Sequence, residues 1–336
     1  MPENHLIVRL GAFGDVMLTT GVLNYWRKTR GFRFHVVTRA GFSAIFNHHP
    51  AVDRIISVNP ENLTAKGWWD FCRRLERDYS SMELVDLHGN LRTAFLRHIW
   101  TGKVRFYPKM GLYRRLYART GATIFKERLL EKNVPQRYAA ALSMKIPDRS
   151  ILTPRLYLRS NEILGAKKRL ADLDLGNKIV CLHPYATHQA KAWPYAKWKQ
   201  LIILLETKGI DWIIIGRNTP SLFPEHPWDL TNQTSIRETG AIISRCSALI
   251  TGDSGPMHLA SAVNTRVIGL FGPTSREWGF YPAGPGDIIL EPDMDCRPCS
   301  LHGQSSNKCN IRCMNLLEPK QVLGALIPVL YSPPPT

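Results

Sequence analysis

Short apolar runs alternate with amphipathic stretches along the first half of the chain. The runs are rich in Val, Ile and Leu, and the stretches between several of them have helical character. Strands that alternate with helices predict βαβ units and a mainly parallel sheet. The expected strands are His5–Leu10, Arg33–Thr38, Arg54–Val58, Glu83–Leu87 and Lys103–Tyr107, and the first expected helix is Asp15–Lys28.

The same alternation begins again after Ile146–Arg159, a segment that contains two prolines and lacks a helical period. We expect this segment to link two domains, residues 1–150 and 151–336. The later strands are expected at Lys178–His183, Asp211–Ile215, Ala248–Thr251, Arg266–Phe271 and before Leu290, with helices at Pro194–Thr207, Ser235–Cys246 and Gly255–Val263. The prediction is an α/β protein of two doubly wound halves. A cleft between them is the expected ligand site, because ligands bind at the carboxyl ends of such strands.

Composition narrows the class of protein. The chain has 336 residues and is 44% hydrophobic, which suits two packed cores and excludes wholesale disorder. No apolar run reaches 18 residues, so no transmembrane helix is expected. The N-terminus lacks a signal-peptide pattern, which favours a cytoplasmic protein. Cys72, Cys181 and Cys246 lie in apolar surroundings, as buried thiols in a reducing compartment would.

Charge is concentrated in one segment. The formal net charge is +17, and Leu91–Arg137, with twelve basic and two acidic residues, carries +10 of it. Such a segment predicts an acidic partner: a phosphorylated small molecule, nucleic acid or an anionic membrane surface. The alternative is an ordinary solvated helical face. The chain has no RNA-recognition motif, zinc-finger pattern or helix-turn-helix signal, which disfavours nucleic acid.

Asp15 is the first candidate for chemistry. It follows Gly11 and Gly14 in R-L-G-A-F-G-D, where an expected strand turns into an expected helix. The two glycines permit a tight turn and a close backbone approach to a ligand. The positive end of the helix favours an ionised carboxylate, the form that a general base needs. The alternative is that Asp15 only caps the helix. The pattern is not G-x-G-x-x-G, so a nicotinamide site is disfavoured.

A second candidate loop runs from His183 to Pro194 and contains Thr187 and Lys191. A hydroxyl, an ammonium group and a helix N-terminus could together hold a diphosphate. The alternative is an ordinary loop with a solvated lysine.

The third candidate is T-G-D-S-G-P-M-H, where a strand ends and a helix begins near Gly255. Backbone N–H groups at such a point form an anion cradle around Asp253 and Ser254. His258 lies one turn into the helix, where it could face the cleft or be structural. Phe271–Ser275 follows the next strand and could form a neighbouring rim of the site.

Four late cysteines have spacing that could bind zinc: Cys296, Cys299, Cys309 and Cys313. A disulfide pair or four reduced thiols are the alternatives.

In this order, the motifs resemble glycosyltransferase family 9, the heptosyltransferases of lipopolysaccharide core assembly. The strongest stretch is Leu249–Ser275, with D-S-G-x-M-H-x-A and F-G-P-T-S; R-L-G-A-F-G-D and Lys191-Ala192-Trp193-Pro194 are also similar. Many members have Pro where this chain has Gly21. The resemblance implies a GT-B fold, two Rossmann-like domains facing across a cleft, with the acceptor in the first domain and the nucleotide sugar in the second.

The resemblance also implies an activity: inverting transfer from ADP-L-glycero-D-manno-heptose to the Kdo- and heptose-bearing inner core on lipid A, with no cofactor and no metal. Asp15 matches the family's proposed general base, and Lys191 and Thr187 match contacts to the donor phosphates. Asp253, Ser254, Gly255 and His258 match the donor-site loop, and Thr234 falls where the family lines the adenine pocket. The basic segment would then contact the acceptor and the inner membrane surface, as in a peripheral cytoplasmic enzyme.

Three alternatives remain open at the level of sequence: a nucleic-acid-binding protein, a non-catalytic member that binds a nucleotide sugar, and a family member with another sugar or acceptor.

Overall fold

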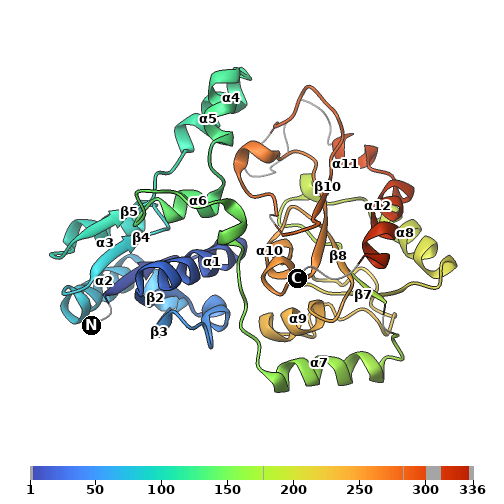
Figure 1. The fold of residues 1–336 in the computed structure, drawn as a ribbon, viewed down its shortest axis with the longest axis horizontal. Coiled ribbons are helices and arrows are strands. Elements are labelled where there is room, and N and C mark those ends of the chain that lie inside the picture. The colour runs from blue at the N-terminus through green and yellow to red at the C-terminus, as the bar shows by residue number, and fades with distance from the viewer. Residues whose placement is uncertain (1–2, 177, 283, 300–311, 333–336) are drawn as a thin grey trace. The chain divides into compact units, whose positions relative to one another are not determined.

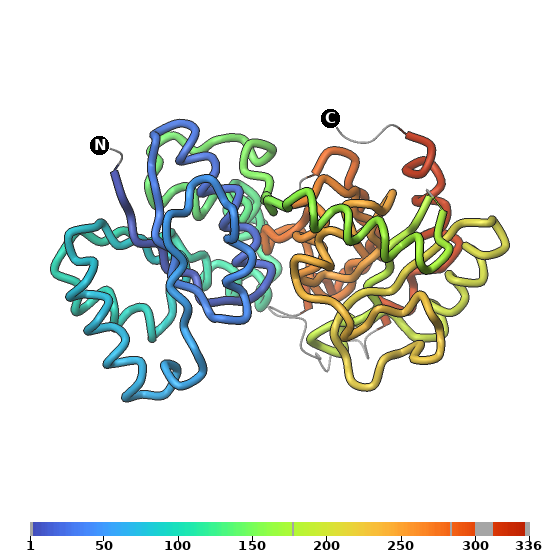
Figure 2. Tube along the Cα trace, turned by 90° about the horizontal axis from the view of Figure 1, so that it is seen from below, coloured from blue at the N-terminus to red at the C-terminus, as the bar shows by residue number. Residues whose placement is uncertain are grey.

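The chain forms two compact units, each built on one parallel sheet (Figure 1). A computed structural model describes residues 3–176, 178–282, 284–299 and 312–332. Unit 1 comprises Met1–Met110 and Val134–Tyr157, and unit 2 comprises Gly111–Asn133 and Leu158–Thr336. Figure 2 traces the chain by residue number through both units.

The sheet of unit 1 has the strand order β3-β2-β1-β4-β5, with every neighbouring pair parallel. Leu6 and Leu84 of the sheet belong to one core with Trp68, Phe71 and Leu96 from the helices that cover this face. The elements of unit 1 are β1 (Asn4–Val8), α1 (Phe13–Arg30), β2 (Arg33–Arg39), β3 (Val52–Val58), α2 (Ala65–Tyr79), β4 (Glu83–Asp86), α3 (Leu91–Ile99), β5 (Val104–Phe106) and α6 (Val134–Ala139).

The sheet of unit 2 has the order β10-β9-β8-β6-β7, again all parallel. Val180 and Ile250 pack with Trp198 of α8 and with Val322 and Leu326 of α12. The elements of unit 2 are α4 (Gly111–Thr120), α5 (Thr123–Leu130), α7 (Ser160–Asp172), β6 (Ile179–His183), α8 (Tyr195–Thr207), β7 (Asp211–Ile214), α9 (Ile236–Ile243), β8 (Ala248–Gly252), α10 (Gly255–Ala262), β9 (Arg266–Leu270), β10 (Ile288–Leu290), α11 (Arg312–Leu316) and α12 (Pro319–Tyr331).

The predicted strands are confirmed, with ends that differ by up to two residues, except that the last, β10, covers only the end of Gly284–Leu290, the stretch from which it was predicted. They were recognisable because strands such as β6 are buried along their whole length and are therefore mainly apolar runs. The expected helices are also present. Three further helices, α7, α11 and α12, were not predicted, although Val322, Leu326 and Val329 of α12 have helical spacing.

The division into units differs from a single boundary near residue 150. Gly111–Asn133 belongs to unit 2, although the chain on both sides of it belongs to unit 1. Arg114 Nη2 donates to the carbonyl oxygen of Trp278 at 3.0 Å, and Lys126 Nζ lies 3.8 Å from Glu277 Oε1. Tyr117 is buried edge-on against the Trp278 ring. Hydrophobic periodicity indicates a helix here but not the core against which it packs.

Gly21 lies inside α1 for a steric reason. A Cβ at this position would lie 2.3 Å from the carbonyl oxygen of Leu152 and 2.5 Å from that of Thr153. The predicted linker therefore passes directly over α1. Only glycine permits this close backbone contact.

The three scattered cysteines are buried, as predicted. Burial raises the pKa of Cys72 to about 12 and raises the pKa of Cys181 well above its usual value. These thiols stay protonated and act as small apolar side chains.

Candidate active site

Both sheets have a point at which the order of their strands reverses, and the candidate residues cluster there. In unit 1 this point lies between β1 and β4, and in unit 2 between β6 and β8. Open α/β sheets bind ligands just beyond the carboxyl ends of the strands at such a point. The predicted loops at Gly11–Asp15, Thr187–Lys191 and Asp253–Gly255 all follow one of these four strands.

Asp15 is the third residue of α1, and its carboxylate is bound on both oxygens. Arg9 Nη2 lies 2.6 Å from Oδ2, and the hydroxyl of Tyr138 donates to Oδ1 at 2.7 Å. The N-cap residue of α1 is Ala12, which makes no side-chain cap. The interpretation of Asp15 as only a helix cap is therefore wrong. Gly11 is buried in the preceding turn, and Gly14 is the second residue of the helix.

The two partners of Asp15 are both buried. Burial alone would lower the pKa of Arg9, but Tyr138, Asp15 and Tyr107 outweigh it, so its pKa is raised and it stays charged. Burial raises the pKa of Tyr138 well above its usual value, so its hydroxyl stays a donor. Asp15 therefore faces one fixed cation and one fixed hydroxyl donor.

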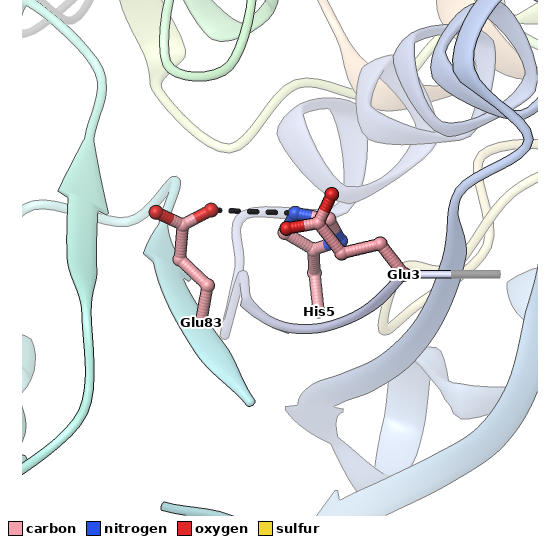
Figure 3. A group of neighbouring side chains, drawn as sticks. All are labelled: Glu3, His5 and Glu83. Atoms are coloured by element: carbon pink, nitrogen blue, oxygen red, sulfur yellow. Dashed lines mark ion pairs between the residues drawn. The ribbon is translucent and has the colours of Figure 1, made fainter. Parts of the chain in front are cut away.

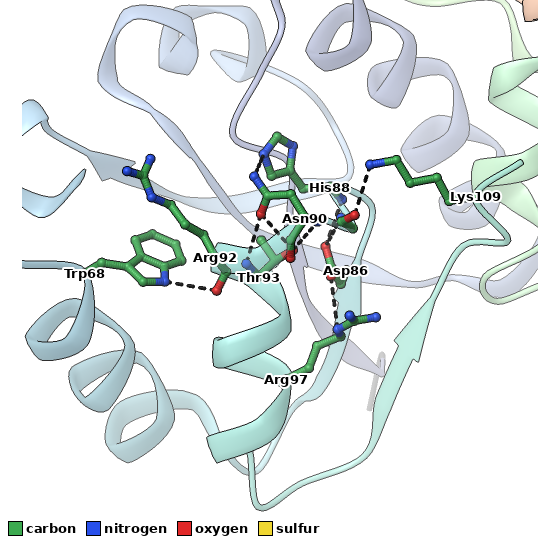
Figure 4. Close-up of polar contacts among 9 residues, drawn as sticks. Trp68, Asp86, His88, Asn90, Arg92, Thr93, Arg97 and Lys109 are labelled. Atoms are coloured by element: carbon green, nitrogen blue, oxygen red, sulfur yellow. Dashed lines mark hydrogen bonds and ion pairs between the residues drawn. The ribbon is translucent and has the colours of Figure 1, made fainter. Parts of the chain in front are cut away.

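The end of β4 supplies a second polar turn in unit 1 (Figure 4). Asp86 Oδ1 accepts hydrogen bonds from the backbone N–H groups of His88 and Gly89, at 2.8 and 2.9 Å. Burial and then Arg9 lower the pKa of His88 to about 4, so this side chain is neutral near pH 7. Lys109 Nζ donates to the carbonyl oxygen of Gly89 at 3.0 Å. Basic residues of the segment Leu91–Arg137, such as Lys109 and Arg97, thus make contacts within unit 1.

In unit 2, Lys191 and Asp253 come together from different loops. Lys191 Nζ lies 2.5 Å from Asp253 Oδ2, and Thr274 Oγ1 donates to the same oxygen at 2.8 Å. A Cβ on Gly252 would lie 3.2 Å from the carbonyl oxygen of Lys191, so glycine lets the two loops meet. The side chain of Lys191 is only 16% exposed, which excludes the interpretation of a fully solvated lysine. Thr187 is exposed on the same loop as Lys191.

Three polar side chains meet at the start of α10, and two of them, His183 and Thr251, are buried. His183 Nδ1 lies 3.0 Å from Thr251 Oγ1 and 3.2 Å from Ser254 Oγ, and the two hydroxyls are 2.9 Å apart. Burial lowers the pKa of His183 to about 4. Ser254 is the N-cap residue of α10 and Gly255 its first residue. The partial positive charge at this end of the helix suits an anion.

The two remaining predicted site residues are also buried. His258, the fourth residue of α10, packs with its ring 6.5 Å from the ring of Phe280. Thr234 precedes α9, and its hydroxyl lies 2.8 Å from that of Thr239. The structure places both residues in unit 2.

Sequence reasoning missed Arg9 and Tyr138 as site residues. Arg9 was visible in the motif R-L-G-A-F-G-D, but its partner was not. Tyr138 lies in α6, 123 residues after Asp15, and the local sequence around it has no feature that links it to β1. Thr274 was predicted only as one residue of Phe271–Ser275, the segment expected to form a rim of the site.

One further cluster has metal-ligand residue types, Glu3, His5 and Glu83 (Figure 3). It lies at the amino ends of β1 and β4, at the opposite edge of the sheet from Asp15. His5 Nε2 is 3.3 Å from Glu83 Oε2, and Arg105 Nε is 3.0 Å from the other oxygen of Glu83. Arg105 already balances the carboxylate charge, so we interpret the cluster as an ion-pair network.

The predicted cysteine cluster is only partly described. Cys313 is buried in α11, and Cys299 Sγ lies 3.9 Å from the carbonyl oxygen of Pro273. Cys309 lies outside the described residues, so the structure does not choose among zinc, disulfide and reduced thiols.

The fold and site together define a GT-B glycosyltransferase, with two Rossmann-like domains that each carry polar residues at a strand-order reversal. Residues 84–310 match the model of glycosyltransferase family 9 (heptosyltransferase). The chain belongs to glycosyltransferase family 9.

Individual relatives agree with this assignment. The chain is 27% identical, over 329 aligned residues, to Lipopolysaccharide heptosyltransferase 1 of Pseudomonas aeruginosa, with 88% of this chain and 85% of that protein covered. A family 9 glycosyl transferase from Veillonella parvula has the same fold, with a TM-score of 0.80, 17% identity, and coverage of 98% of this chain and 97% of that chain. The E. coli ADP-heptose lps heptosyltransferase II has a TM-score of 0.73, 18% identity and 98% coverage of each chain.

Proposed function

We propose that this enzyme transfers heptose from ADP-L-glycero-D-manno-heptose to the inner core of lipopolysaccharide, with inversion and with Asp15 as the general base. Family membership and the names of its relatives support the sugar and the acceptor. The observation that carries the mechanism is the Asp15 carboxylate, which is held in the first turn of α1 where the strand order of unit 1 reverses.

The proposed reaction is a single displacement. Asp15 takes the proton of an acceptor hydroxyl while that oxygen forms a bond to the anomeric carbon. The bond between this carbon and the β-phosphate oxygen breaks, and its electron pair leaves with ADP. One displacement inverts the anomeric centre. The proton ends on Asp15, and no redox partner is needed.

Unit 2 would bind the leaving ADP. Negative charge grows on the β-phosphate as the bond breaks, and Lys191 and the N-terminus of α10 are suited to stabilise it. A diphosphate would compete with Asp253 for the Lys191 ammonium group, with Thr187 beside it. Thr234, Ser254, Gly255 and His258 are proposed to line the rest of the donor site. In this mechanism neither a cofactor nor a metal ion is required.

Nucleotide binding tests the proposal first. Calorimetry without added metal should show tight binding of ADP and weak binding of UDP, GDP, CMP and NAD. Purified ADP-heptose and a truncated lipopolysaccharide acceptor should then give product in the presence of EDTA, with the inverted anomeric configuration by NMR. A preference for UDP or GDP would overturn the heptose assignment. Binding of ADP without transfer to any acceptor would indicate a non-catalytic member.

We also propose that the enzyme acts in the cytoplasm at the inner membrane surface. No helix among the described residues is long and apolar enough to cross a membrane. The helices α4 and α5, however, expose Leu112 (64%) and Ile124 (71%) beside Arg115 and Arg119. Apolar side chains among basic ones suit an anionic lipid surface. Sedimentation should show binding to phosphatidylglycerol vesicles and little binding to phosphatidylcholine vesicles. Equal binding to both would contradict the charge argument.

A further inference from the structure

We propose that Arg9 and Tyr138 are positioning residues that hold the Asp15 carboxylate in one orientation. The proposal rests on the proposed role of Asp15 as the base. It adds two residues to which the sequence analysis assigned no role.

The arrangement around Asp15 is built from three separate elements of unit 1. Arg9 follows β1, Asp15 lies in α1 and Tyr138 lies in α6. Arg9 is 5% exposed and Tyr138 is 1% exposed. Arg9 uses both ends of its guanidinium group, because Nη1 donates to the carbonyl oxygen of Leu87 at 2.5 Å while Nη2 contacts Asp15 at 2.6 Å. The guanidinium carbon also lies 5.3 Å from the centre of the Tyr138 ring.

These contacts fix the plane of the carboxylate. Each oxygen of Asp15 has one short contact, so rotation of the carboxylate would break both. The guanidinium group cannot follow such a rotation, since Leu87 anchors its other end. Each carboxylate oxygen has a further lone pair, which can receive the proton of the acceptor hydroxyl. The base is thus held in place and still able to act.

The ionisable groups around Asp15 leave Arg9 as the cation that contacts it. His88 interacts with Arg9, Asp15 and Lys109, and burial lowers the pKa of His88 to about 4, so its ring is neutral near pH 7. Tyr107 interacts with Arg9 and Tyr138. Arg9 and Tyr138 are therefore the groups that hold the two carboxylate oxygens of Asp15.

The decisive variant is Tyr138→Phe, which removes only the hydroxyl donor to Asp15. The contact that fixes Oδ1 is then lost, so the single-turnover rate should fall by about tenfold or more, because a misplaced catalytic group loses rate steeply. The KM for ADP-heptose should stay within about twofold, since the proposed donor contacts belong to unit 2. A rise of KM with a wild-type single-turnover rate would overturn the proposal.

Tyr157→Phe is the matched control. Its hydroxyl bonds to Asn24 Oδ1 at 3.0 Å, also in unit 1. Asn24 lies nine residues after Asp15 on α1, about 13 Å along the helix axis. This variant also loses a tyrosine hydroxyl bond, but it should keep the wild-type single-turnover rate. The same loss of rate in both variants would mean that general loosening of unit 1 is the cause.

Arg9→Lys is the second variant and covers the case in which Tyr138→Phe does not fold. Lysine keeps the charge but cannot bridge Leu87 and Asp15 as the fork does. The single-turnover rate of transfer should fall by about tenfold or more while ADP affinity is unchanged. A wild-type rate in Arg9→Lys would overturn the positioning role.

Asp15→Asn separates failure of this proposal from failure of the proposed function. Full activity in Asp15→Asn would remove Asp15 as the base, and the positioning role would fall with it. An inactive Asp15→Asn together with wild-type single-turnover rates in Tyr138→Phe and Arg9→Lys would leave the proposed function standing and overturn only the positioning role.

Discussion

Each of the two strand-order reversals holds an ion pair, and the two pairs are held differently. In unit 1 both oxygens of the Asp15 carboxylate are bound by buried donors from other elements. In unit 2 Lys191 contacts, among the described residues, one carboxylate. A lysine ammonium group has three hydrogens, so it can still donate to an incoming anion. The proposed base is thus fixed in unit 1, whereas the lysine proposed to bind the donor in unit 2 keeps hydrogens available for a ligand.

Asp15→Asn should have the largest effect of these variants, and it should lower the rate of transfer without changing ADP binding much. Transfer should fall by about 10²–10⁴-fold, the usual contribution of a general base. ADP affinity should stay within a few-fold of the wild-type value, because all the residues proposed to contact ADP belong to unit 2. Single-turnover assays and calorimetry measure the two quantities separately. A comparable loss of ADP binding would break the division of labour between the units.

Lys191→Ala should affect the nucleotide binding that is proposed for unit 2. It removes a charge-assisted contact to the donor phosphates, so ADP binding should weaken by about 1–3 kcal/mol. Lys199→Ala is the control, since Lys199 is exposed on the adjoining helix α8 and has no predicted role. Calorimetry should distinguish the two variants. An unchanged dissociation constant in Lys191→Ala would remove this residue from the donor site.

Gly21→Ala tests how firmly unit 1 holds the helix that carries Asp15. The new Cβ would clash with the carbonyl oxygens of Leu152 and Thr153, so the free energy of unfolding should fall by about 1–3 kcal/mol. Gly165→Ala in α7 is the control. A Cβ there meets nothing within 4 Å, and the better helix propensity should raise stability by about 0.5–1 kcal/mol. Urea unfolding measures both, and equal effects would contradict the close contact over α1.

Acid should weaken both units through buried neutral histidines, in a smaller and more gradual effect. Burial lowers the pKa of His49 in unit 1 and of His183 in unit 2 to about 4. Between pH 6.5 and about 4 the unfolded chain binds a proton that the folded chain does not. Stability therefore falls with falling pH, by about 1.4 kcal/mol per pH unit for each such histidine.

The variant His183→Asn should reduce the slope of stability against pH by the contribution of one histidine, about 1.4 kcal/mol per pH unit. The asparagine keeps a polar partner for Thr251 and Ser254. Unfolding measured at several pH values gives the slope directly. A slope equal to that of the wild type would mean that His183 does not contribute.

Most of the fold could be predicted because strands and turns are marked by local patterns in the sequence. The fully buried β6 and β8 are unbroken apolar runs, and the turns after them are marked by glycine and small polar residues. Asp15, Lys191 and Asp253 were predicted as site residues because each lies between a predicted strand and the body of the helix that follows it. The roles predicted for them come from the resemblance to family 9.

The contacts between distant residues could not be predicted in this way. The bond from Tyr138 to Asp15 spans 123 positions, and that from Lys191 to Asp253 spans 62. Periodicity identifies a helix at Gly111–Thr120, but Tyr117 could pack against either core with the same pattern. Only the tertiary fold shows that it packs against Trp278.

The excursion of Gly111–Asn133 into unit 2 matters for gene fusions and chimeras. The chain passes between the units three times, after Met110, after Asn133 and after Tyr157. Unit 2, which is proposed to bind the donor, is therefore not encoded by one continuous stretch of the gene. A chimera joined at residue 157 would give Trp278 and Glu277 the α4–α5 pair of another enzyme. If unit 2 binds the donor as proposed, exchange of donor specificity between relatives by recombination must transfer residues 111–133 together with the C-terminal half.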